Sequence, residues 1–296
     1  MRDSAPTPPP SILVLADLSA AAEKAAQYAA AAAVSLAARL TLLHLQQSPV
    51  MVAPELVAMS SAQATEEEAE LAAGLDELAR RLPGQTEVVM TTGPMFEAVA
   101  DAVRRYCPLL LAVGLSADDN LLDHILNNHV LPVVRATRQP LLLVPAGASS
   151  PPGLPHRIVL ALDAEPFAFS AASQRLTQFF AACPAAYTVV HINANDEQTG
   201  SPGQLAVADV RACALLPPAA PIDLYEEDHR HPATGILQAV ADTEADLLVL
   251  IARPRSFLNR LFHESVTAQI LRRSPVPVLL LPAEGPEGAD WMPTMS

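Results

Sequence analysis

The stretch Ile12-Leu-Val-Leu-Ala-Asp17 decides the fold, because it has a counterpart about half the chain further on, at Ile158-Val-Leu-Ala-Leu-Asp163. Both stretches are apolar runs of strand length that end on an aspartate, and each precedes a helical pattern. Self-similarity on this scale indicates two copies of one structural unit. The chain has 296 residues, which is enough for two cores of about 130–150 residues each.

Two further pairs of segments support the duplication. Leu109-Leu-Leu-Ala-Val113 parallels Leu247-Leu-Val-Leu-Ile251, and such continuous apolar runs are typical of strands buried on both faces of a parallel sheet. Pro140-Leu-Leu-Leu-Val-Pro-Ala146 parallels Pro277-Val-Leu-Leu-Leu-Pro-Ala283, so prolines bracket a short strand in both copies. Because proline cannot donate to an interior ladder, these two strands are predicted to lie at a sheet edge.

Strand and helix patterns alternate between these anchors. The first half predicts strands at 12–16, 40–45, 86–91, 109–113 and 141–144, and helices at 20–38, 66–82, 95–106 and 120–136. The second half predicts strands at 158–162, 187–192, 222–225, 247–251 and 278–281, and helices at 169–182, 204–216, 233–243 and 259–272, of which 204–216 has the weakest pattern. Five strands alternating with four helices predict a doubly wound parallel sheet in each half.

The chain is therefore expected to divide into five parts. These are a disordered segment at 1–10, a first domain at 11–146, a linker at 147–156, a second domain at 157–283 and a tail at 284–296. The linker prediction rests on the Pro, Gly and Ser content of its residues.

Composition argues against several classes of partner. A net charge of −14 and a pI near 4.9 disfavour nucleic acid and anionic membrane surfaces.

The three cysteines, at 107, 183 and 213, are widely spaced and form no CxxC or Cys/His pattern. We therefore expect Cys107, Cys183 and Cys213 to be small buried or half-buried residues, and we expect no metal or redox centre. The first ten residues do not resemble a secretory signal, and the apolar runs are far shorter than the ~20 residues that cross a bilayer. A cytoplasmic protein is expected.

The ordered recurrence of these features resembles the universal stress protein family over nearly the whole of both halves. In that family the first strand ends in Asp, often followed by a small residue and Ser; Asp17-Leu18-Ser19 fits, whereas Asp163-Ala164-Glu165 keeps only the Asp. The fourth helix of the family runs into an Arg and a Pro-flanked strand, as at Arg135-Ala-Thr-Arg-Gln-Pro140 and Arg272-Arg-Ser-Pro-Val-Pro277. The resemblance implies two tandem five-stranded α/β domains of strand order 3-2-1-4-5, the adenine nucleotide alpha hydrolase-like fold.

The resemblance also locates the expected nucleotide loop. Members that bind ATP carry, after the fourth strand, Gly, two residues, Gly, nine residues, then Gly and Ser or Thr. Glycines let the backbone approach phosphates closely, and amides at a helix start donate to the anion. The spacing falls on Gly114, Ala117, Asn127 and Asn128 in the first domain and on Ile251, Pro254, Glu264 and Ser265 in the second. One glycine survives in the first domain and none in the second.

The residues that replace the glycines disfavour phosphate. Pro254 lacks an amide donor, and Glu264 places a carboxylate where the family places phosphate. Asp118 and Asp119 add the same repulsion directly after the first domain's loop. The nucleotide-binding loop is therefore predicted to be degraded in both domains.

Three local features leave alternatives open. Arg253, Arg255 and Arg260 could hold an anion through their side chains, or form a solvated surface or a pair with Glu264. Asp17 and Asp163 end the first strands, where open sheets bind ligands and the family places adenine, but an Asp there can equally cap a helix or lie in a solvated loop. The Asp228-His-Arg-His231 segment could bind metal or be a loop before a helix, and we assign no metal to it.

The candidate remnant nucleotide-site residues are thus Asp17, Gly114, Asn128, Asp163, Arg253, Arg255 and Ser265. No residue is predicted to be catalytic, because neither a nucleophile elbow nor a Walker lysine loop nor a zinc-protease motif occurs. We expect a stress-response regulatory or scaffold protein with little or no ATP binding and no resident cofactor. The alternatives are a protein that binds ATP, AMP or another phosphorylated ligand through the second domain, and a slow phosphohydrolase.

The family resemblance implies how the chain assembles. The short fifth strands of the family commonly pair across a dimer interface, so segments 140–145 and 277–282 are expected to pair within this one chain. Further assembly into a homodimer and binding of an unidentified protein partner are also expected.

Overall fold

The computed structural model describes residues 9–46, 54–116, 137–149, 151–163, 165, 167–193, 201–253 and 266–284. These ranges leave out the expected helix at 120–136 and the first part of the one at 259–272. They also leave out most of the disordered segment predicted at 1–10 and nearly all of the tail.

The first domain has the predicted doubly wound sheet. Its elements are β1 (Ser11–Leu15), α1 (Ala20–Ser35), β2 (Arg39–Gln46), α2 (Pro54–Arg81), β3 (Thr86–Thr92), α3 (Met95–Tyr106), β4 (Leu110–Leu115) and β5 (Leu141–Pro145). Its strands pair in the order β3-β2-β1-β4-β5, all in parallel, so the expected order 3-2-1-4-5 is confirmed. Helix α2 begins at Pro54 rather than near residue 66, and proline suits the first helical turn.

The second domain repeats the order. Its elements are β6 (Arg157–Ala161), β7 (Ala168–Phe169), α6 (Ala171–Gln174), α7 (Thr177–Ala182), β8 (Ala186–Asn193), α8 (Pro202–Ala212), β9 (Ile222–Asp228), α9 (Pro232–Asp242), β10 (Leu247–Ala252), α11 (Val266–Arg273) and β11 (Val278–Glu284). The order β9-β8-β6-β10-β11 is again 3-2-1-4-5. The weakly predicted helix at 204–216 is present as α8.

One predicted helix of the second domain is wrong. Residues 169–182 form the short β7 and two short helices, α6 and α7, instead of one continuous helix. Strand β7 pairs with β11, and the Ser173 hydroxyl donates to the Pro282 carbonyl over 2.8 Å. The Ser170 side chain caps α6 by accepting the Ser173 N–H at 3.2 Å. These tertiary bonds hold the segment against β11 and break the helical pattern.

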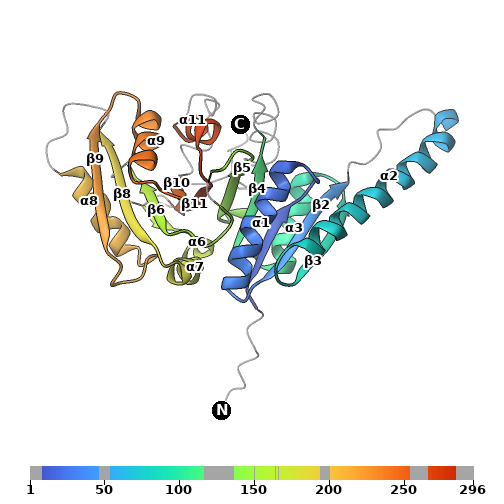
Figure 1. The fold of residues 1–296 in the computed structure, drawn as a ribbon, viewed down its shortest axis with the longest axis horizontal. Helices are drawn as coiled ribbons and strands as arrows, with labels where there is room; N and C mark the ends of the chain where they lie inside the picture. The colour runs from blue at the N-terminus through green and yellow to red at the C-terminus, as the bar shows by residue number, and fades with distance from the viewer. Residues whose placement is uncertain are drawn as a thin grey trace, which may run out of the picture.

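The two domains share one sheet. Strands β5 and β11 pair antiparallel, with Leu142 opposite Leu279, so the expected pairing of the fifth strands within the chain is present. Figure 1 shows β3 and β9 at the two ends of this sheet and β5 and β11 near its middle. The edge predicted from the prolines is thus the edge of each domain but not of the molecule. The strands of the two domains run in opposite directions, so their carboxyl ends lie at opposite margins of the sheet.

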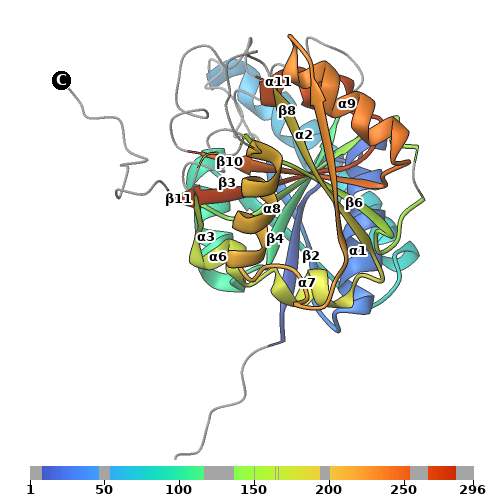
Figure 2. The ribbon, with the colours of Figure 1, turned by 90° about the vertical axis from the view of Figure 1, so that its left-hand side faces the viewer.

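Two apolar cores flank the sheet. Helices α1, α2, α7 and α8 contribute to one core, and α3, α9 and α11 contribute to the other. Figure 2, viewed from the second-domain end, shows helices on both sides of the twisted strands. The Lys24 ammonium on α1 donates to the Ala148 carbonyl over 2.6 Å and ties α1 to the segment that follows β5. Among the helices that the structure describes, none combines the length and the apolar character needed to span a membrane.

The three cysteines differ in environment. Cys183 is buried and Cys213 half-buried, as expected, but Cys107 is exposed, so the prediction is wrong there. Cys107 ends α3 in a left-handed conformation with φ of 44°, which turns the chain at the protein surface. Burial, with a smaller contribution from Asp246, raises the pKa of the Cys183 thiol from 9.0 to about 12.

The difference in burial between Cys107 and Cys183 predicts the order in which their thiols are labelled. Because the thiolate is the reactive form, an aromatic disulfide reagent should label Cys107 first and Cys183 only as the protein unfolds. Stopped-flow absorbance, with Cys107→Ser and Cys183→Ser to assign the phases, would measure the rates. Equal labelling rates for the two cysteines in the native protein would contradict the predicted order.

The folded state also holds the Cys183 proton more tightly than the unfolded chain. Its contribution to the free energy of unfolding is therefore present below pH 9.0 and is lost as the pH rises toward about 12.

Candidate functional site

In the first domain, Asp17 lies just beyond β1, where the chain turns into α1. Its carboxylate accepts the Ser19 N–H at 3.0 Å, and the Ser19 hydroxyl accepts the Ala22 N–H at 3.1 Å. Leu18 between them has φ of 60°, in the left-handed region. Asp17 is exposed and organises the turn that lets Ser19 cap α1. The cap of α1 is thus Ser19, and the Asp17 carboxylate bonds within the turn that precedes it.

Gly114 lies within β4, beside the carboxyl end of β1. A Cβ at this position would stand 2.2 Å from the backbone carbon of Ala21 and 2.5 Å from the Ala22 nitrogen. The first turn of α1 therefore rests directly on the β4 backbone. This contact alone requires glycine at position 114, whether or not a phosphate is bound nearby.

In the second domain, the structure brings together two of the predicted residues. Asp163 follows β6 and Arg253 follows β10, and an Arg253 Nη2 to Asp163 Oδ1 distance of 2.5 Å joins them. Arg253 also donates to the Glu165 carbonyl over 2.6 Å, and its guanidinium lies 5.6 Å from the centre of the Phe167 ring. The Arg253 side chain is only 16% exposed. Because Arg253 Nη1 also lies 3.5 Å from Glu165 Oε2, the guanidinium is engaged by two acidic side chains of its own chain. Glu264, the partner considered from sequence, lies outside the described residues.

An acidic side chain also occupies the start of α8. Glu226 on β9 accepts the Gly203 N–H in the first turn of α8 at 3.2 Å. The Asn193 amide donates to the Asp228 carboxylate over 2.9 Å at the end of the same strand pair. A helix start favours anions, and here a carboxylate of the chain already takes one of its amides.

Two histidines at equivalent positions were missed by the sequence reasoning. His44 on β2 places Nδ1 2.7 Å from the Ala16 carbonyl, and His191 on β8 places Nδ1 3.0 Å from the Leu162 carbonyl. Each of these carbonyls directly precedes an aspartate of the candidate sites. Because a carbonyl only accepts, Nδ1 carries the proton in both rings. The repeated Thr-x-x-His spacing, Thr41 to His44 and Thr188 to His191, was the signal that could have revealed them.

His191 has a distinctive second nitrogen. The residue is 2% exposed, and among the described residues its Nε2 has no hydrogen-bond partner. In the neutral ring with the proton on Nδ1, this buried Nε2 is an acceptor. Both histidines therefore position the backbone next to the aspartates, and His191 additionally offers a buried lone pair.

The remaining candidates cannot be placed. Asn128, Arg255 and Ser265 lie outside the described residues, as do most of both loops. In the Asp228 to His231 segment, the His231 N–H donates to His229 Nδ1 over 3.0 Å. The described part of the chain contains no group of three or more His, Cys, Asp or Glu side chains that could hold a metal.

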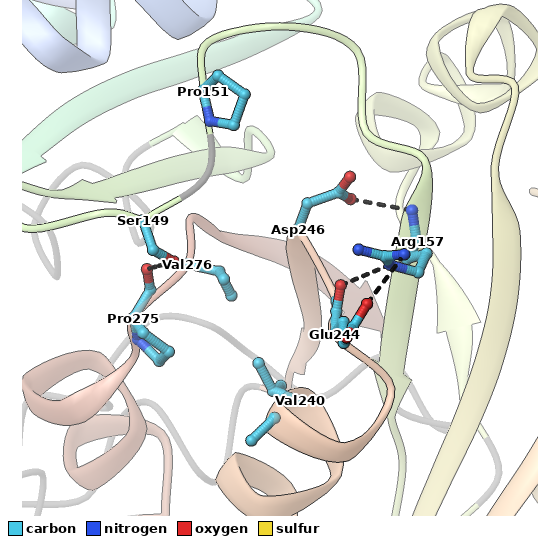
Figure 3. Close-up of a pocket in the computed structure, with 10 residues that line it drawn as sticks. Ser149, Pro151, Arg157, Val240, Glu244, Asp246, Pro275 and Val276 are labelled. Atoms are coloured by element: carbon cyan, nitrogen blue, oxygen red, sulfur yellow. Dashed lines mark hydrogen bonds and ion pairs between the residues drawn. The ribbon is translucent and has the colours of Figure 1, made fainter.

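A pocket of about 340 Å³ lies at the opposite margin of the second domain's sheet, beside the linker. Figure 3 shows Arg157 at its wall, held by Glu244 and Asp246. Arg157 Nη1 lies 3.2 Å from Glu244 Oε2, and Arg157 Nε donates to the Glu244 carbonyl over 2.7 Å. The Asp246 carboxylate accepts the backbone N–H of Arg157 at 3.0 Å. Because each of these charged groups already has a charged or backbone partner, we assign no ligand to the pocket.

One family model and two solved structures match this chain over most of its length. The model of the universal stress protein family matches residues 10–145 and 155–282. A universal stress protein from Archaeoglobus fulgidus DSM 4304 superimposes with a TM-score of 0.61 at 15% identity, over 91% of this chain and 95% of that one. A functionally unknown protein from Pseudomonas aeruginosa PAO1 gives 0.53 at 16% identity, over 92% of each chain. No curated protein matches the chain.

Proposed function

The chain belongs to the universal stress protein family, and we propose that it is a stress-response regulatory or scaffold protein with little or no affinity for ATP. The observation that carries this proposal is the pairing of Arg253 with Asp163 and Glu165. Those contacts occupy the one candidate cation that the structure describes at the second domain's site. The degraded glycine spacing in both loops supports the same conclusion. The expected setting is the cytoplasm, without a nucleic-acid partner.

The carboxylates of this ion pair explain why it disfavours a phosphorylated ligand. The Asp163 side chain is 58% exposed, so a phosphate could reach the largely buried Arg253 and displace Asp163 from it. The released carboxylates would then face the incoming anion. Two like charges about 4 Å apart repel by about 1 kcal/mol in water and about 4 kcal/mol at an effective dielectric constant of 20.

The alternative is a protein that binds ATP, AMP or another phosphorylated ligand through Asp163, Arg253, Arg255 and Ser265. Its support is that Arg253 is largely buried and already oriented at the carboxyl end of β10. In this alternative the ligand replaces Asp163 as the partner of Arg253. Slow hydrolysis of that ligand would be a further property, seen as metal-dependent turnover that Asp163→Ala removes.

Calorimetry with ATP and magnesium separates these proposals. We expect no saturable heat from the wild-type protein, and no nucleotide released when freshly purified protein is denatured. The variant Arg253→Met should behave as wild type, and Arg157→Met, at the opposite margin of the sheet, is the matched control. Micromolar binding that Arg253→Met weakens about tenfold or more, while Arg157→Met does not, would establish the alternative.

A further inference from the structure

The two ends of the shared sheet differ in how they resist pairing with another strand. Strand β9 carries Asp223, Glu226, Glu227 and Asp228 within seven residues, and charges on an edge strand oppose such pairing. Strand β3 carries one acidic residue, Glu87, whose carboxylate accepts the Tyr106 hydroxyl at 3.1 Å. Strand β3 is therefore the less protected end.

The backbone of β3 has groups available on its outer side. The Leu40 N–H bonds to the Gln85 carbonyl, and the register places Leu40 opposite Thr86. Bonding groups alternate in a parallel ladder, so those of Val88 and Met90 point away from β2. Among the described strands, β3 pairs only with β2.

Side chains on both faces of β3 could extend to an added strand. Val88 packs against the core beneath α2, and Val89 packs against the core that includes α3. Val88, Val89 and Met90 are all half-buried. A neighbouring strand with β-branched residues would cover the exposed half of this row, because side chains directly opposite each other interact across a strand pair.

The helix beside β3 is unusually long and acidic. Helix α2 has 28 residues, whereas α8, its counterpart in the second domain, has 11. In Figure 1, α2 projects beyond the β3 end of the sheet. The exposed acidic residues of its central part are Glu66, Glu67, Glu68 and Glu70. Because α2 packs against β3, most of the negative charge here lies on the helix beside β3 rather than on β3 itself.

We propose that β3 binds an extended segment of a protein partner as an added strand, with alternating β-branched residues and flanking Lys or Arg. The inference rests on the partner-binding role proposed above and names the chemistry of that partner. Backbone bonds to Val88 and Met90 would supply affinity, and the glutamates of α2 would select basic flanks. A second copy fits less well, because each chain carries a charge of −14 and the same acidic α2.

Fluorescence anisotropy with two labelled peptides tests this inference on the full chain. The basic probe is Lys-Lys-Val-Thr-Val-Thr-Val-Lys-Lys, and the acidic probe replaces each Lys with Glu. We expect saturable binding of the basic probe only. Met90→Pro removes an outward N–H and should weaken binding about tenfold, whereas Met90→Thr retains the N–H and should leave binding within about twofold.

A second variant avoids any question of folding. Glu67→Lys combined with Glu70→Lys changes two exposed helix positions and should weaken the basic probe while improving binding of the acidic one. Equal affinity of both probes for the wild type, or binding unaffected by Met90→Pro, would overturn the inference. So would a homodimer in sedimentation that Met90→Pro dissociates, because a second copy would then occupy the edge. If the basic probe does not bind, this inference fails but the proposed function does not, because the ATP titration tests that function separately.

Discussion

Replacing Gly114 with alanine is expected to lower the free energy of unfolding by about 3 kcal/mol or more. The added Cβ would lie 2.2 Å from the Ala21 backbone carbon. Neither partner can yield easily, because Gly114 is in a buried strand and Ala21 is in the first turn of α1. The clash can be relieved only by moving the helix away from the sheet, which opens the packing of its buried alanines. Urea unfolding followed by circular dichroism would measure the loss.

Gly147 provides the matched control. It is exposed, a Cβ there would meet no atom within 4 Å, and its φ is not in the left-handed region. Gly147→Ala should therefore be neutral or stabilise slightly by restricting the unfolded chain, by up to about 1 kcal/mol. If Gly114→Ala proved as stable as Gly147→Ala, the structural explanation of Gly114 would fail and a ligand-related role would regain support.

Leu280→Asp is expected to have a comparable or larger effect, a loss of about 4 kcal/mol or more. Leu280 is fully buried on β11 and lies opposite Leu141 of β5, where the two domains join. A carboxylate there would be desolvated between two apolar strands, and its pKa would have to rise for it to remain buried. Calorimetry and denaturant unfolding would measure the change.

Leu280→Met keeps the volume and apolar character and should cost less than about 1.5 kcal/mol. Because β5 and β11 belong to one sheet, Leu280→Asp should destabilise both domains rather than the second alone. Thermal unfolding in which the first domain keeps its wild-type transition would contradict this coupling.

The candidate site was predictable to different depths in the two domains. Asp17 and Asp163 could be placed at strand ends because the end of an apolar run is visible in sequence. The ion pair of Arg253 could not be predicted from the sequence, because its partner Asp163 is 90 residues away along the chain. His44 and His191 carried a repeated spacing, but their bonds to the carbonyls that precede the aspartates depend on strand register. Gly114 was assigned to a phosphate loop from its spacing, although the contact that requires glycine comes from α1.

The sequence by itself determined the two repeats, their alternating strands and helices and the degraded glycine spacing, because apolar periodicity and residue type are local properties. Only the tertiary structure decided that β7, α6 and α7 replace one helix, since the bond from Ser173 to Pro282 spans more than half of the second domain. The tertiary structure likewise decided which sheet ends stay open. Two proline-flanked strands each look like an edge in sequence, and whether two edges pair depends on their meeting in space.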